Sequence, residues 1–467
     1  MPSTRTFTVA FSALITLNLA LLIIAGCPLT PGGPNTPGAD ANSPSHDANS
    51  PANDANSPAN DANSPTGDPN NSTADPNSPV ADPNIATDPN APTDPNTPTD
   101  PNNVPATQSQ YVVFGYNELG MHCMNQDFSE LMLLPPYNNL RAQVLRRGEE
   151  PRIITSGATV NYALPGNTHS VDKTNFWTYA KALLNADLAP NVGLTGNGLS
   201  GTMVLTGEND WVATGIPITP LNDLMQEDAY QLADVTVQVN GAEVTRTQAV
   251  VPVSWEISCN LCHTTPGISV MTDILRKHDT LHATTLEAGK PVLCAGCHAD
   301  PALGAAGQPG VSTMSGAMHT SHAPRMSAVN LVVECYACHP GQQTECLRDV
   351  HYSAGMVCND CHTSMAAVGS PTRTPWVDEP RCTDCHHVAG HQYEQTGTLY
   401  RMSVGHGNVH CVACHNSPHA ITPTVKTQDN LQAIALQGHP GTIDTCVVCH
   451  TQKPDESFFH TAGGEDE

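Results

Sequence analysis

Apolar and polar residues alternate along four segments that begin between residues 111 and 252, with the period of half-buried β-strands. The segments read LRAQVLRRG, PRIITSGATVNYAL, SGTMVLTG and DVTVQVNGAEVTRTQAVVPVSWEISC. In the last of them, Asn240 and Gly241 are the residue types that a two-residue hairpin turn prefers. This pattern predicts a β-rich domain over residues 111–252, a sandwich or a barrel, whose last strand leads directly into Cys259.

One segment of the same region has the helical period instead. It is VDKTNFWTYAKALLNA, residues 171–186. Its apolar residues recur at helical spacing and would form one face of a helix. That face consists of Phe176, Tyr179, Ala180, Leu183 and Leu184. The domain is therefore expected to contain one helix beside its strands.

Residues 253–467 contain the motif C-x-x-C-H seven times. This is the attachment signature of c-type haem, in which the two thiols add to the porphyrin vinyl groups and the histidine binds iron. Zinc ribbons and redox dithiols also use C-x-x-C, but neither requires a histidine after the second cysteine. The motifs predict seven covalent haems. The attaching cysteines are Cys259, Cys262, Cys294, Cys297, Cys335, Cys338, Cys358, Cys361, Cys382, Cys385, Cys411, Cys414, Cys446 and Cys449. The proximal iron ligands are His263, His298, His339, His362, His386, His415 and His450.

On these seven motifs the chain resembles the bacterial multihaem c-type cytochromes, over residues 259–450. The resemblance implies covalent haem, electron transfer and assembly outside the cytoplasm. Aromatic residues make up only 4% of the chain, so haem would supply much of the apolar surface of this region. Successive motifs start 35, 41, 23, 24, 29 and 35 residues apart, which leaves room for a short helix and a loop each. We expect a haem-cored domain over residues 253–467 that is mostly irregular or short-helical.

Twelve further histidines follow residue 258, more than seven irons need as distal ligands, which fits ligation by two histidines at every iron. The candidates are His278, His282, His319, His322, His351, His387, His391, His406, His410, His419, His439 and His460. We favour His351, His387, His410 and His439, because each lies close to a motif in the sequence. Methionine is the alternative sixth ligand. The methionines available are Met314, Met318, Met326, Met356, Met365 and Met402.

The N-terminus predicts export. Arg5 is followed by an apolar run from Val9 to Gly26 and then by Cys27. The end of the run resembles a bacterial lipobox, which would make residues 1–27 a signal peptide and Cys27 the acylated first residue. A transmembrane anchor is the alternative, since the run approaches the necessary length of about 20 residues. Pro28, rather than an aspartate, favours the outer membrane or cell surface over the inner membrane.

Residues 28–110 form a predicted disordered tether. Units that open with aspartate repeat every seven and then every six residues, from Asp40 to Asp100. Polar repeats rich in proline and asparagine cannot bury enough apolar area to fold. These aspartates lack the clustering of a calcium loop. The chain carries a net charge of −26, which disfavours a nucleic-acid partner. Redox partner proteins, an external electron acceptor and the membrane are the expected partners.

The stretch GYNELGMHCMNQDFSE, residues 115–130, contains four consecutive residues that can ligate soft metals, Met121, His122, Cys123 and Met124. Three interpretations stay open. Cys123 and Cys346, the cysteines outside the haem motifs and the lipobox, could form a disulfide. His122 could be a distal haem ligand. A copper site would need a further histidine such as His169.

Two classes of function fit the sequence. In the first, the protein carries electrons along closely spaced haems, to a membrane component or an extracellular acceptor, and self-association into a filament is compatible with the surplus histidines. In the second, it is a multihaem oxidoreductase that acts on a small nitrogen or sulfur compound at one open haem. All seven motifs end in histidine and few tyrosines lie near them, which favours the carrier. A structural or haem-storage role is a third, weaker class.

Overall fold

The computed structural model describes residues 109–387, 393–455 and 460. The predicted signal peptide with Cys27, the tether up to residue 108 and the candidate ligand His391 lie outside these residues. The described residues belong to one compact unit. Among them, no helix is long and apolar enough to cross a membrane.

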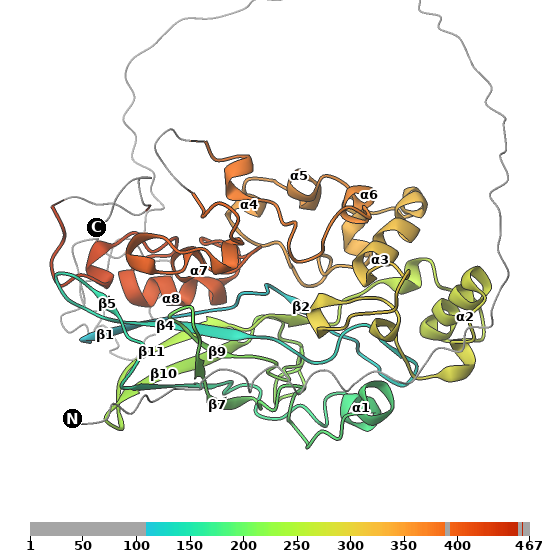
Figure 1. The fold of residues 1–467 in the computed structure, drawn as a ribbon, viewed down its shortest axis with the longest axis horizontal. Coiled ribbons are helices and arrows are strands. Elements are labelled where there is room, and N and C mark those ends of the chain that lie inside the picture. The colour runs from blue at the N-terminus through green and yellow to red at the C-terminus, as the bar shows by residue number, and fades with distance from the viewer. Residues whose placement is uncertain (1–108, 388–392, 456–459, 461–467) are drawn as a thin grey trace, which may run out of the picture. The chain divides into compact units, whose positions relative to one another are not determined.

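Residues 109–254 form two antiparallel sheets (Figure 1). The first sheet has the order β1-β4-β9-β8, with β5 also paired to β4, and the second has the order β11-β10-β6-β7. The first consists of β1 (Tyr111–Tyr116), β4 (Leu140–Arg146), β5 (Arg152–Ile153), β8 (Val204–Leu205) and β9 (Trp211–Ala213). The second consists of β6 (Ala158–Ala163), β7 (Ser200–Thr202), β10 (Leu232–Val239) and β11 (Ala242–Val250). The β-rich prediction for this region is confirmed.

Both sheets contribute to one hydrophobic core. Val113 and Val144, which are register partners in the first sheet, belong to the same buried cluster as Val235 and Tyr162, which are partners in the second. Helix α1 (Phe176–Leu184) adds the face that the sequence predicts, with Phe176, Ala180, Leu183 and Leu184 buried. Asn240 and Gly241 have φ angles of 52° and 77°, so the predicted hairpin turn uses two left-handed residues.

Strand β1 separates this core from a second one. Val113 points into the core between the sheets, whereas Val112, Phe114 and Tyr116 pack with residues of the sixth and seventh C-x-x-C-H motifs. The sequence analysis did not identify YVVFGY as a strand. Five of its six residues are buried, so it lacks the alternation that marks a half-buried strand.

Residues 255–460 contain short helices joined by turns and loops, as expected from the motif spacing. The helices are α2 (Val270–His282), α3 (Met314–His322), α4 (Val350–Ser353), α5 (Cys358–His362), α6 (Met365–Val368), α7 (Cys411–His415) and α8 (Thr427–Gln437). Two short parallel pairs connect the segments: β12 (Val253–Ser254) with β2 (His122–Cys123), and β13 (Val292–Leu293) with β3 (Leu131–Met132). Figure 1 shows α7 and α8 along one side of the sheets.

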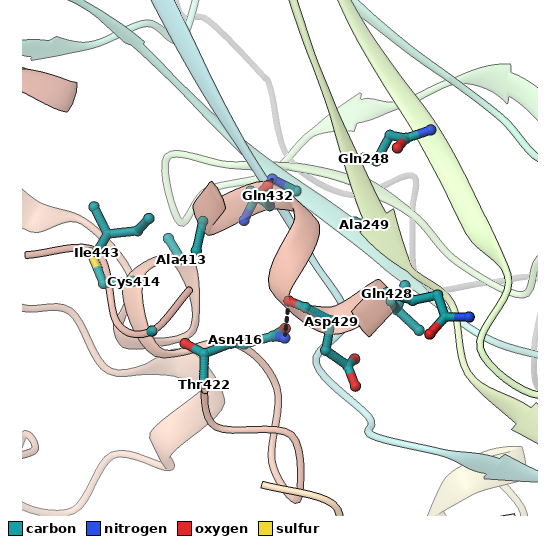
Figure 2. A pocket seen from close by; sticks show the side chains of 14 residues that line it. Gln248, Ala249, Ala413, Cys414, Asn416, Thr422, Gln428, Asp429, Gln432 and Ile443 are labelled. Atoms are coloured by element: carbon teal, nitrogen blue, oxygen red, sulfur yellow. Dashed lines mark hydrogen bonds between the residues drawn. The ribbon is translucent and has the colours of Figure 1, made fainter. Parts of the chain in front are cut away.

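The side chain of Gln432 joins helix α8 to strands β1 and β11 by two hydrogen bonds. The side-chain oxygen of Gln432 accepts hydrogen bonds from the Gly115 N–H at 2.7 Å and from the Thr247 hydroxyl at 3.0 Å. Gly115 leaves no room for a larger residue, since a Cβ atom would lie 3.1 Å from Ala249. Figure 2 shows the small pocket at this junction, where Gln432 and Asp429 of α8 approach Cys414 and Ala249. It holds about 20 Å³, which is the space of a single water and not of a substrate.

Candidate functional site

Each C-x-x-C-H motif folds as one tight turn. The N–H of the histidine donates to the carbonyl of the first cysteine, at 2.9 Å in His263, 3.1 Å in His298 and 2.8 Å in His386. The fourth and sixth motifs are the five-residue helices α5 and α7. Residues three and four positions apart share a face of such a turn. The turn therefore gathers both cysteines and the histidine on one side.

Six of the seven motif histidines face a second imidazole from another segment of the chain. The distance between ring centres lies between 5.9 and 6.4 Å in every pair. The pairs are His298 with His278, His339 with His319, His362 with His419, His386 with His351, His415 with His460, and His450 with His406. All six partners are among the histidines that the sequence analysis proposed as distal ligands.

The remaining motif histidine, His263, has a weaker indication of the same arrangement. Burial lowers its pKa, and Lys277 and His322 add to that effect, so His322 is a near neighbour. His322 and His319 lie three residues apart on α3, which places them on one face of that helix. One helix thus presents imidazoles to both the first and the third motif.

The spacing of these pairs has a direct chemical meaning. Two imidazoles that bind one metal from opposite sides are separated by two metal–nitrogen bonds of about 2 Å plus about 1.1 Å from each nitrogen to its ring centre, or about 6.2 Å in all. The observed range of 5.9–6.4 Å includes this value. Rings in tilted or edge-to-face contact reach similar distances, as Tyr116 and His410 do at 6.2 Å, so the spacing is compatible with a shared metal and does not by itself require one.

The number of ligands also discriminates between metals. Among the residues that the structure describes, no group of three or more histidine, cysteine, aspartate or glutamate side chains could hold a metal ion. A structural zinc requires four protein ligands, whereas a porphyrin supplies four nitrogens and leaves only two positions for the protein. Pairs of imidazoles fit the second case, and the adjacent cysteine pairs fit covalent attachment of the porphyrin.

Hydrogen bonds orient these imidazoles by their Nδ1 atoms. Seven of the paired histidines, and His322 beside the first motif, use Nδ1 for a hydrogen bond, which leaves Nε2 for a metal. The bonds join His278 to Thr284, His298 to the Ser312 carbonyl, His319 to the Ser315 carbonyl, His322 to the Met318 carbonyl, His351 to Asp349, His415 to Thr442, His419 to Cys346 and His450 to the Glu149 carbonyl. Their lengths run from 2.7 Å to 3.8 Å, the longest being the bond to the Cys346 sulfur.

Two candidate ligands have the opposite arrangement. The Nε2 atom of His122 lies 2.7 Å from the Pro135 carbonyl, and that of His410 lies 3.0 Å from the Glu208 carbonyl. Burial lowers the pKa of His122 to about 4, so the ring is neutral. His410 is 1% exposed and packs beside Tyr116 of β1. His410 is buried and His122 is half-buried, both rings bond backbone carbonyls of the β-rich region, and neither has a ring contact with a motif histidine.

Three further candidates are also unpaired with a motif histidine. His439 has its Nε2 atom 3.5 Å from Asp444. His282 lies beside His278, with 4.8 Å between ring centres. His387 faces no imidazole among the described residues, although it directly follows His386. Proximity in the sequence, which favoured His387, His410 and His439, therefore identified only His351 of the four preferred residues as part of a pair.

The residue before the stretch from Met121 to Met124 lies beside the segment that carries His419. A Cβ atom on Gly120 would lie 3.3 Å from the Pro418 carbonyl and 3.9 Å from Nδ1 of His419. Cys123 and Cys346 are free thiols. Burial raises the pKa of Cys123, and the nearby charge of Cys346 raises it further. His169 bonds with Asp172 and Asp223 and does not join this stretch.

Neighbouring motifs contact one another in a nearly continuous series. The Ser258 N–H, beside the first motif, donates to Ala337 of the third at 3.1 Å, and Cys335 donates to Asn359 of the fourth at 3.5 Å. The Ile443 N–H, which precedes the seventh motif, donates to Cys414 of the sixth at 3.1 Å.

Between these contacts, the cysteine thiols themselves are neighbours. Burial raises the pKa of Cys361, and Cys385 of the fifth motif adds to the effect. Burial and Glu394 raise the pKa of Cys382 to about 11, with Cys411 of the sixth motif contributing. The order in space is therefore first, third, fourth, fifth, sixth and seventh. Helix α3, which starts with a hydrogen bond from Met314 to Ala299, joins the second motif to the first and third.

No protein-family model matches the chain, and no curated protein and no solved structure matches it.

Proposed function

We propose that this protein is a seven-haem c-type cytochrome that carries electrons at the cell envelope. One observation carries the proposal: six of the seven motif histidines face a second imidazole from another part of the chain at 5.9–6.4 Å, a separation compatible with two imidazoles bound to one iron. The sequence motif and the long-range histidine partner are independent features. Their coincidence at six motifs, with His322 near His263 of the remaining first motif, supports the proposal.

The residues that would hold each haem follow from the pairs. The two cysteines of a motif would form the thioether bonds, and its histidine and the partner histidine would both bind the iron. Haem bound in this way supplies reversible one-electron exchange between ferrous and ferric iron. The Nδ1 hydrogen bonds hold each ring in the tautomer and orientation that present Nε2 to the metal.

The arrangement favours a carrier over a catalyst. An iron with two protein imidazoles has no free position for a substrate. A second cavity, of about 170 Å³, is lined by Cys411 and His460, which belong to the proposed sixth haem site.

The location is part of the proposal. Acylation of Cys27 and the long polar repeat after it would anchor the protein to a membrane and hold the haem region away from the lipid. Redox proteins or an external acceptor are the proposed partners, and self-association is compatible with this role.

The test is haem quantification and electron paramagnetic resonance of the fully oxidised full-length protein, made in a host that attaches c-type haem. We expect seven haems per chain, all low-spin, and no change of the spectrum when cyanide is added. A high-spin iron that binds cyanide would refute the carrier assignment and identify the active haem of an oxidoreductase. A protein without covalent haem would refute the proposal as a whole.

A further inference from the structure

The hydrogen-bond acceptors of the paired imidazoles are chemically unequal. Carbonyl groups or hydroxyl groups accept at six of the eight bonded rings, and Cys346 accepts at a seventh. His351, the partner of His386 in the fifth motif, has a carboxylate: its Nδ1 lies 3.2 Å from Oδ2 of Asp349. A carboxylate acceptor increases the basicity of an imidazole ligand much more than a neutral acceptor does.

Asp349 is built into the fold with its carboxylate fixed in place. The side chain is nearly inaccessible, at 3% exposure. Its Oδ1 atom accepts hydrogen bonds from the backbone N–H groups of His351 at 2.9 Å and Tyr352 at 3.0 Å, which caps the short helix α4. Oδ2 is thereby directed at the imidazole of the same turn.

Among the residues that the structure describes, no lysine or arginine forms an ion pair with this carboxylate. The adjacent guanidinium of Arg348 is turned away and is bonded to Asp429 at 2.6 and 2.9 Å. Asp273 provides the contrast, because its carboxylate lies 3.5 Å from Nδ1 of His263 but is bonded to Lys277 at 2.5 Å. The negative charge of Asp349 therefore acts on His351 with little compensation, whereas that of Asp273 is shared with an ammonium group.

We propose that Asp349 is a positioning residue that lowers the reduction potential of the haem site formed by Cys382, Cys385, His386 and His351. The inference rests on the proposed function. A more basic axial imidazole stabilises the ferric state, so this site is harder to reduce than it would be with a neutral acceptor. It would form a low-potential step inside the series of neighbouring sites, between the fourth and the sixth motif.

The test compares full-length haem-loaded D349N and D349S with the wild type by redox titration and electron paramagnetic resonance. Asn and Ser cap helices as well as Asp does, so both variants keep α4 and remove only the charge. We expect one of the seven reduction equilibria to shift ten- to a hundredfold towards the ferrous state, about 60–120 mV upwards. The g values of the low-spin signal of the same haem should also change. In D349E, the potential should return part of the way to the wild-type value.

Two controls make the result specific. D378N removes an exposed carboxylate just before the same motif, one that bonds only the Thr374 N–H, and should leave all seven potentials in place. H351A should convert the shifting component to high spin and so identify it. The inference would be overturned if D349N and D349S bind seven haems with unchanged potentials while H351A converts one haem to high spin. That result would leave the proposed function intact. Loss of haem from the wild type would instead refute the proposed function.

Discussion

The buried ion pair between Arg348 and Asp429 connects the site region to α8, and it provides a quantitative prediction. The two side chains are 0% and 1% exposed, and Nε lies 2.6 Å from Oδ2. At an effective dielectric constant of 20, the Coulomb attraction across this distance is about 6 kcal/mol. Replacing Arg348 with Met also removes the cost of burying its charge. The expected net loss is therefore about 3–5 kcal/mol of the free energy of unfolding.

Removing the Arg348 side chain should also disturb the proposed haem ligand His419. The Arg348 N–H donates to the His419 carbonyl at 2.9 Å, and the Arg348 carbonyl accepts from Val425 at 3.0 Å. R348M should therefore lower the denaturant midpoint in far-ultraviolet circular dichroism and broaden the low-spin signal of the site formed by His362 and His419. The double variant R348M/D429L removes both charges, and it should recover most of the stability because no unpaired charge stays buried. Additive losses in the double variant would refute this account of the pair.

Three further variants separate the roles assigned to individual residues. H406A should produce one high-spin haem. H410A should lower the free energy of unfolding by about 1–3 kcal/mol and leave all haems low-spin, because the His410 ring bonds to the Glu208 carbonyl; a high-spin haem in H410A would contradict the assignment. F114A should lower the free energy of unfolding by about 3–5 kcal/mol and perturb the spectra of the proposed haem sites at the sixth and seventh motifs. V113A, on the other face of β1, should lower it less and leave those spectra unchanged. Equal spectral effects would contradict the division of β1 into two faces. The pKa of His122 is lowered to about 4, so the free energy of unfolding should fall as the pH falls from 6.5 towards 4, by up to about 3 kcal/mol. H122Q should flatten this pH dependence in acid denaturation. An unchanged slope would show that a group other than His122 causes it.

Structural features that depend on neighbouring residues in the chain could be predicted from the sequence. The hairpin at Asn240 and Gly241 and the helix around Phe176 depend on residues within a few positions of one another, and both occur as predicted. Strand β1 was missed because burial on both faces removes the alternation on which recognition depends. The motifs themselves are local in the same way.

The histidine partners could not be assigned from the sequence, for a different reason. His410 adjoins Cys411, yet its ring is held by a carbonyl of the loop before β9. His419 follows the sixth motif but faces His362 of the fourth. These partnerships are set by how β1, α3 and α8 bring distant segments together, and adjacency along the chain carries no information about that. The choice between Nδ1 and Nε2 depends on the same long-range contacts.

The crossed pairing of His362 with His419 and of His415 with His460 has a consequence for maturation. A chain exported from its N-terminus would present the fourth motif well before its partner histidine emerges, and the sixth motif only completes its pair near the end of the chain. The second motif, whose partner His278 precedes it, would be complete at once. Under the proposed function, biogenesis would therefore pass through states in which specific irons have one protein ligand and are open to small molecules. Truncated chains that end before residue 419 should stop in such a state, with reactivity that the finished protein does not have.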